Sequence, residues 1–167
     1  MATCRAMRDV EQGVQLFNKR LDQGAIGYIV QDRTNQVVGY AWVSCTENLL
    51  EDDDRYRLLC NPQQAYIFDT YLHPDTRGKN IYGLLISLLG DDLLAKEKRE
   101  QLFVLVDQSN LRSLRAHKKL GAQLKETCCY VAVSGICHYT LTSSEQRTCF
   151  RRFHTNKPCI SLYLNGH

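Results

Sequence analysis

One stretch of the chain, residues 66–85, restricts the fold more than any other. It opens with an apolar, aromatic-rich segment, Tyr66–Leu72, breaks at Pro74, passes through a basic loop around Gly78 and continues with the apolar spacing of a helix. A helix that follows such a loop presents its first N–H groups without intrahelical partners. Those groups bind phosphate and pyrophosphate. The stretch therefore predicts a site for a ligand that carries a pyrophosphate.

Taken alone, this stretch is a weak signal. The chain has no Gly-x-x-x-x-Gly-Lys-Ser/Thr run and no Gly-x-Gly-x-x-Gly after a strand, so the two common nucleotide-binding motifs are excluded. An ordinary surface turn that opens a helix would explain Arg77–Gly83 equally well. The interpretation changes with a second motif, residues 110–122, which follows a charged helix and an apolar strand.

Together the two motifs resemble the GNAT superfamily of acyl-coenzyme-A-dependent N-acyltransferases. The pyrophosphate loop of that family, Arg/Gln-x-x-Gly-x-Gly/Ala, aligns with Arg77–Tyr82. The later signature, Asn-x-x-Ala-x-x-x-Tyr-x-Lys-x-Gly-Phe, aligns with Asn110–Ala122. Val37–Val43 is similar to the third strand of the family, and the resemblance covers residues 7–142. It implies an α+β fold, in which a mixed, mostly antiparallel sheet is splayed between its fourth and fifth strands and flanked by helices.

Three residues depart from the family pattern. Asn80 and Tyr82 stand where the family usually has small residues against the pyrophosphate. Asn is one of the few residues other than Gly that tolerates positive φ, so Asn80 can replace a small residue there. We expect Tyr82 to project outward and to use only its N–H, with Gly83 as a shifted substitute. His117 stands where the family often has a Tyr as general acid.

Length and composition indicate one compact domain. A chain of 167 residues, 44% of them hydrophobic, can bury a substantial core and is too short for two ordinary domains. We expect the acetyltransferase domain to occupy residues 1–143 and a C-terminal extension to occupy residues 144–167. The net charge of +3 is too small to indicate nucleic-acid binding, and aromatic residues do not alternate with basic ones as on an RNA-binding surface.

The eight cysteines form no Cys-x-x-Cys pair, which argues against a zinc site and against a disulfide framework. The sequence has no signal peptide and no long apolar run, so we expect a cytoplasmic protein with reduced thiols, no metal and no membrane partner. A catalytic Cys is the alternative to buried structural thiols, which are the favoured interpretation.

Hydrophobic periodicity and turn residues predict the elements along the chain. One amphipathic helix is expected over residues 7–21. Another runs from Ile81 to about residue 100, with Ile81, Leu84, Leu85, Leu88 and Leu89 on one face. The remaining expected elements are strands 26–30, 37–45, 65–72 and 102–106, an exposed loop 46–64, a helix 110–120 and a terminal hairpin 123–133/136–142.

The C-terminal extension has a basic stretch, Arg147–His154, followed by the apolar Cys159–Leu164. The apolar part is expected either to add a strand to its own sheet or to dock on a second subunit, and a partly disordered extension is the alternative. We expect a homodimer.

The resemblance also implies a coenzyme site. The pantetheine arm of acetyl-CoA would pair with backbone at Tyr71, Leu72 and His73, where the Leu72 N–H would polarise the thioester carbonyl. Asn110 and Ser113 would contact the same arm, although Asn110 could simply cap its helix or do both. The pyrophosphate would be held by the Arg77 side chain and by the backbone of Gly78, Lys79, Asn80, Ile81, Tyr82 and Gly83.

Asp69 is the candidate base that would take a proton from the substrate ammonium, directly or through water. It lies mid-strand among apolar residues, where a carboxylate is costly unless it is partnered or functional. A hydrogen-bonded sheet-edge role is the alternative. His117 is the candidate acid for the leaving thiolate, with a plain surface histidine as the alternative. Tyr130 and Tyr139 are further phenolic donors and candidate substrate-binding residues.

These features predict an enzyme that transfers an acetyl group directly from acetyl-CoA to a primary amine of a small acceptor. A coenzyme-binding or regulatory module of the same fold, without full activity, is the alternative. Glu47 and Glu51–Asp54 would give the acceptor side a negative field that favours a cationic amine. The same acidic run could instead be plain solvated surface.

Overall fold

The computed structural model describes residues 10–45, 49–50, 56–76, 78–133, 136–143, 147–153 and 160–163, and side chains within 13–45, 60–76, 78–129, 140 and 142. Two compact units emerge, and each is described by itself. The first unit is Met1–Glu47 with Cys60–Ser109, and the second unit is Asn48–Leu59 with Asn110–His167. The domain boundary expected at residue 143 stays a prediction.

The first unit contains a four-stranded sheet with the order β1-β2-β5-β6. Strands β1 and β2, and β2 and β5, are antiparallel, whereas β5 and β6 are parallel. This is the mixed, mostly antiparallel sheet that the sequence predicted. Its elements are α2 (Val10–Asp22), β1 (Ile26–Gln31), β2 (Val37–Ser44), β5 (Gln64–Leu72), the 3-10 turn η1 (Pro74–Thr76), α3 (Ile81–Glu97) and β6 (Gln101–Val104).

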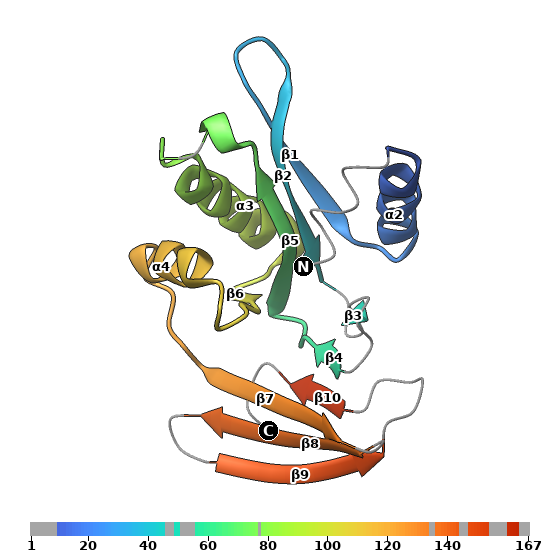
Figure 1. The fold of residues 1–167 in the computed structure, drawn as a ribbon. Coiled ribbons are helices and arrows are strands. Elements are labelled where there is room, and N and C mark those ends of the chain that lie inside the picture. Colours follow the sequence, from blue (N-terminus) through green and yellow to red (C-terminus); the bar gives the residue numbers. More distant parts are fainter. Residues whose placement is uncertain are drawn as a thin grey trace. The chain divides into compact units, whose positions relative to one another are not determined.

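Helices α2 and α3 cover opposite faces of this sheet (Figure 1). Successive side chains of a strand point to opposite faces. Tyr40 and Trp42 of β2 meet Phe17 of α2, with ring centroids 5.4 and 5.2 Å apart. Ala41 and Val43, which alternate with these two aromatic residues along β2, point to the face that α3 covers. A buried apolar core on that face consists of Ala41, Val43, Ala65, Ile67, Leu85, Leu89 and Leu93.

The predicted buried face of α3 was partly wrong. Leu85, Leu89 and Leu93 are buried, whereas Leu84 and Leu88 are each 58% exposed. Apolar residues surround almost the whole helix, so their spacing alone could not identify which face meets the sheet. The i, i+4, i+8 row is the one that packs against β2 and β5.

Strand β5 carries a bulge. Its pairing with β2 skips from Trp42↔Phe68 to Ala41↔Thr70, so Asp69 is the extra residue, and its φ of 52° is left-handed. Pairing with β6 ends at Ile67↔Val104, although β5 continues to Leu72. Strands β5 and β6 therefore stop pairing just before the bulge, where the resemblance implied that the sheet splays.

The second unit contains two three-stranded sheets, ordered β10-β4-β3 and β7-β8-β9, and helix α4. Strands β7 and β8 form the predicted terminal hairpin, with Val133 opposite Ile136. The bounds are β3 (Leu49–Leu50), β4 (Tyr56–Leu59), α4 (Leu111–Lys119), β7 (Glu126–Val133), β8 (Ile136–Ser143), β9 (Arg147–Phe153) and β10 (Ile160–Tyr163).

The expectation for one connecting segment needs correction. The exposed loop predicted over residues 46–64 contains β3 and β4, and its last part includes the buried residues Cys60 and Gln64. The basic stretch from Arg147 forms strand β9, which pairs with β8. The segment Ile160–Tyr163 pairs in parallel with β4.

The acidic residues Glu47 and Glu51–Asp54 lie outside the described residues.

Among the described residues, no helix is long and apolar enough to cross a membrane. Within the same part of the chain, no three His, Cys, Asp or Glu side chains are grouped as they would be around a metal ion.

Candidate active site

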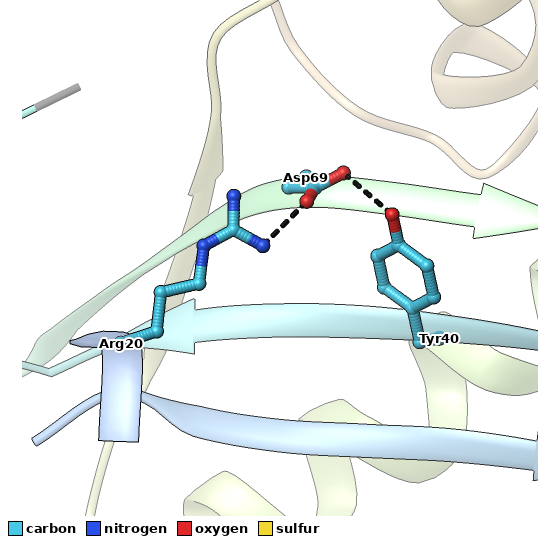
Figure 2. Close-up of polar contacts among 3 residues, drawn as sticks. All are labelled: Arg20, Tyr40 and Asp69. Carbon is cyan, nitrogen blue, oxygen red and sulfur yellow. Dashed lines mark hydrogen bonds and ion pairs between the residues drawn. The ribbon is translucent and has the colours of Figure 1, made fainter. Parts of the chain in front are cut away.

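The bulge residue Asp69 is the centre of a polar network within the first unit (Figure 2). The Arg20 Nη1 group donates to Asp69 Oδ2 at 2.5 Å, and the Tyr40 hydroxyl donates to Asp69 Oδ1 at 3.4 Å. The Asp69 side chain is only 6% exposed. Both carboxylate oxygens are therefore engaged, and a carboxylate retains further acceptor positions beyond these two contacts.

Arg20 reaches Asp69 from the end of α2 through a group of aromatic rings. Its guanidinium carbon lies 5.4 Å from the Trp42 ring centroid and 5.2 Å from that of Phe68, and 6.0 Å from that of Phe17. The sequence analysis did not identify Arg20. Its position three residues after Phe17 places it beside Phe17 on one helix face, which was the available signal.

The end of β5 presents the three residues predicted to bind the pantetheine arm. The His73 N–H donates to the Val38 carbonyl of the β2 side at 2.7 Å. Peptide groups alternate between the two edges of a strand, so the Leu72 N–H points to the other edge, along which β6 pairs with the start of β5. Tyr71 stacks on Tyr40, with ring centroids 5.8 Å apart.

The loop after β5 contains two left-handed residues before α3. Gly78 has a φ of 79° and Asn80 a φ of 58°. The expectation that Asn80 adopts positive φ is confirmed. The Leu84 N–H donates to the Asn80 carbonyl at 3.1 Å, so the N–H groups of Ile81–Gly83 precede the first intrahelical bond. Lys79 is exposed beside them, and Arg77 lies outside the described residues.

Tyr82 does not project outward as expected. Its side chain is half-buried, and its hydroxyl shares a hydrogen bond with Thr70, the residue after the bulge. Burial raises the pKa of the Tyr82 hydroxyl, and the bond to Thr70 partly offsets that rise. The phenol therefore anchors the first turn of α3 to β5. This contact was not predictable from the residue pattern, because Thr70 faces Tyr82 only once the bulge has shifted the alternation of β5.

The remaining predicted residues belong to the second unit, with Asn110, Ser113 and His117 at α4 and Tyr130 and Tyr139 on β7 and β8. The Asn110 side chain caps this helix by accepting a bond from the Ser113 N–H at 3.1 Å. His117 Nδ1 lies 2.8 Å from the Ser113 carbonyl, which can only accept, so Nδ1 carries the proton. The backbones of Tyr130 and Tyr139 are paired across β7 and β8, and their side chains are not among those described.

Three of the described thiols do not resemble a reactive nucleophile. Burial raises the pKa of Cys60 to about 11 and that of Cys128 to about 11. It also raises the pKa of Cys45. A raised pKa keeps these thiols protonated at neutral pH, whereas catalytic cysteines have lowered values.

Comparison with known proteins identifies the family. Residues 4–122 match the sequence profile of the Acetyltransferase (GNAT) family. This match covers well over half of the chain, so the chain belongs to that family. The family, the fold class and the enzyme class that the sequence predicted are confirmed. No curated protein sequence matches the chain.

Solved structures share the fold at low sequence identity. One is the ribosomal-protein-alanine N-acetyltransferase of Brucella melitensis biovar Abortus 2308, at 18% identity and a TM-score of 0.54, covering 79% of this chain and 86% of that one. Another is an aminoglycoside N-acetyltransferase in complex with CoA, at 13% identity and a TM-score of 0.56, covering 77% and 91%. A third is an aminoglycoside 6'-N-acetyltransferase of Acinetobacter haemolyticus, at 14% identity and a TM-score of 0.53, covering 74% and 81%.

Proposed function

We propose that this GNAT-family chain transfers an acetyl group from acetyl-CoA to a primary amine of a small acceptor, directly within a ternary complex. The observation that carries the proposal is the loop between β5 and α3. Gly78 and Asn80 are both left-handed there, and the chain then enters the N-terminus of a 17-residue helix. Such an arrangement directs N–H groups and the positive end of the helix dipole at an anion.

In this proposal each part of the coenzyme has its own residues. The pyrophosphate lies against the backbone of residues 78–83, with Lys79 and Arg77 as cations beside it. The pantetheine arm follows Tyr71, Leu72 and His73. These residues lie at the end of β5, beyond the part that pairs with β6, on the same edge of the strand. Asn110 and Ser113 contact the same arm, in addition to the helix cap that they form.

The chemistry requires a base, an oxyanion donor and an acid. Asp69 takes a proton from the ammonium of the acceptor, directly or through water, which leaves a neutral amine to attack the thioester carbonyl. The Leu72 N–H stabilises the negative oxygen that develops. His117 protonates the departing thiolate. Because its Nδ1 proton is directed at Ser113, donation from Nε2 requires the imidazolium form. Tyr130 and Tyr139 are the alternative donors.

Isothermal titration with acetyl-CoA, followed by thiol-release assays on a panel of amines, tests the proposal. Binding with turnover supports it, and absence of binding removes it. Binding without turnover supports the second candidate, a coenzyme-binding or regulatory module. That candidate is favoured by one observation, that both oxygens of Asp69 are already engaged.

Gly78→Ala is expected to weaken acetyl-CoA binding by about tenfold, because a left-handed conformation costs an L-residue roughly 1–2 kcal/mol. The φ of Gly78 is 79° and an added Cβ would meet nothing within 4 Å, so the change tests conformation alone. Gly121→Ala is the matched control, with a φ of 82° and the same open surroundings after α4. Titration of both variants measures the effect. Equal weakening in both would assign the loss to general destabilisation.

The acceptor is proposed to be cationic, because Glu47 and Glu51–Asp54 are acidic. Replacing Glu51–Asp54 with Ser and Gln is expected to raise the KM for a polycationic amine and to flatten its dependence on salt, since screened attraction is lost. Steady-state kinetics at several ionic strengths measure both. An unchanged KM with an unchanged dependence on salt would show that the acidic residues do not contribute to acceptor binding.

We also propose a cytoplasmic homodimer without nucleic-acid or membrane partners. The dimer stays a prediction from the apolar segment 159–164, whose residues Ile160–Tyr163 pair with β4 of the same chain. Size-exclusion chromatography with light scattering decides the oligomeric state, and a monomer at all concentrations would remove the dimer.

A further inference from the structure

We propose that Arg20 is a positioning residue of this acetyltransferase. It holds Asp69 in the left-handed conformation that creates the bulge in β5, and the bulge fixes the direction in which Tyr71 and Leu72 face. The kinetic part of this inference rests on the proposed function, whereas the conformational part does not.

The bulge needs a restraint. Asp69 has a φ of 52°, and a left-handed conformation is unfavourable for residues other than Gly, although Asp tolerates it better than most. The carboxylate is also almost buried, where an uncompensated charge is unfavourable. The ion pair with Arg20 meets both needs, because it compensates the charge and holds the side chain in one place.

Arg20 itself has little freedom. Its side chain is 11% exposed, and the aromatic rings of Phe17, Trp42 and Phe68 surround its guanidinium. A cation is attracted to the face of an aromatic ring, and the attraction is strongest where water is excluded. A planar guanidinium can stack on rings and direct a hydrogen bond at once, which a Lys ammonium cannot do. The anchor is therefore specific to Arg.

The bulge sets the direction of the strand end. Side chains alternate along a strand, so one extra residue reverses the alternation of everything that follows. With Asp69 inserted, Tyr71 faces Tyr40 and Thr70 faces Tyr82. Tyr40 also donates to Asp69, so the same tyrosine contacts both the bulge and the residue that the bulge orients. Without the restraint, Tyr71 and Leu72 would lose their fixed orientation.

The first test is Arg20→Lys, with Arg33→Lys as the matched control in the exposed β1–β2 turn. In Arg20→Lys we expect backbone N–H groups of residues 70–73 to exchange with deuterium faster, while those of α3 keep their rates. A misplaced catalytic group costs up to roughly 100-fold, so we expect kcat to fall about 10–100-fold with a much smaller change in acetyl-CoA Kd. Unchanged exchange at residues 70–73 would overturn the proposal.

The second test asks whether Arg20 acts through Asp69. Gly adopts positive φ without a Cβ penalty, so an Asp69→Gly chain keeps the bulge without a restraint. Neither variant leaves a buried carboxylate, but Asp69→Gly leaves the buried Arg20 guanidinium without its partner. Adding Arg20→Met removes that charge, so it is expected to leave deuterium exchange at residues 70–73 unchanged or to slow it. A further rise in exchange at residues 70–73 would show that Arg20 acts independently of the bulge. This measurement needs no activity, so it separates failure of this inference from failure of the proposed function.

Discussion

Replacing Asp69 with Asn is expected to lower kcat about 10²–10⁴-fold, which is the usual contribution of general acid–base catalysis. Asn has nearly the same shape and also tolerates positive φ, so the bulge is retained while the basic group is lost. The rise of kcat/KM with pH that a base produces should disappear, and the acetyl-CoA Kd should change far less. Steady-state kinetics across pH and isothermal titration measure these quantities.

The ion pair complicates this test and also supplies its control. Asp69→Asn leaves Arg20 buried without its partner, and breaking a buried pair in this way costs about 3–5 kcal/mol. Part of the lost activity could therefore come from unfolding. The double variant Arg20→Met/Asp69→Asn removes the stranded charge. Loss of the Arg20 restraint alone is expected to lower kcat about 10–100-fold, so the double variant is compared with Arg20→Lys. If Asp69 is the base, the double variant is less active than Arg20→Lys although folded by circular dichroism, and its kcat/KM no longer rises with pH. Turnover no lower than that of Arg20→Lys would give Asp69 a purely structural role.

Local chemistry made some of the site predictable. Asn80 was expected to be left-handed because few other residues tolerate that conformation, and its φ is 58°. Asn110 was expected to cap its helix because its side chain can accept from an N–H three residues on, and Ser113 supplies that N–H. In both cases the residue type and its neighbours decide the geometry.

Contacts between distant segments were not predictable in this way. Arg20 and Asp69 are 49 residues apart in sequence, and their pairing depends on how α2 packs on the sheet. The hydrogen bond between Tyr82 and Thr70 depends on the bulge at Asp69. The apolar pattern of Tyr66–Phe68 does not predict that a bulge follows it. Strand β9 contains Thr148, Phe150 and Phe153, residue types that favour strands, but its own sequence does not identify β8 as its partner.

Replacing Gly39 with Ala is expected to destabilise the fold by about 1–3 kcal/mol, the usual cost of adding atoms to a packed interior. A Cβ at Gly39 would lie 2.4 Å from Leu72 Cδ2 and 2.6 Å from the Tyr71 carbonyl oxygen. The Leu72 side chain could rotate away, but the carbonyl is backbone, so β2 and β5 would have to move apart. The shift would occur at Tyr71 and Leu72, so acetyl-CoA binding should weaken as well.

Gly90→Ala is the matched control for this prediction. Gly90 lies inside α3, and its added Cβ would come no closer than 3.4 Å, to Leu102 Cδ1. Alanine is favoured over glycine in a helix interior by roughly 0.5–1 kcal/mol, so this variant should be slightly more stable than the wild type. Urea unfolding of the three proteins measures the free energy of unfolding. The free energy of unfolding is expected to fall in Gly39→Ala and to rise in Gly90→Ala. The added methyl group meets the neighbouring strand at Gly39, whereas it has room in the helix at Gly90. A Gly39→Ala protein as stable as Gly90→Ala would mean that β2 and β5 do not approach as closely as described.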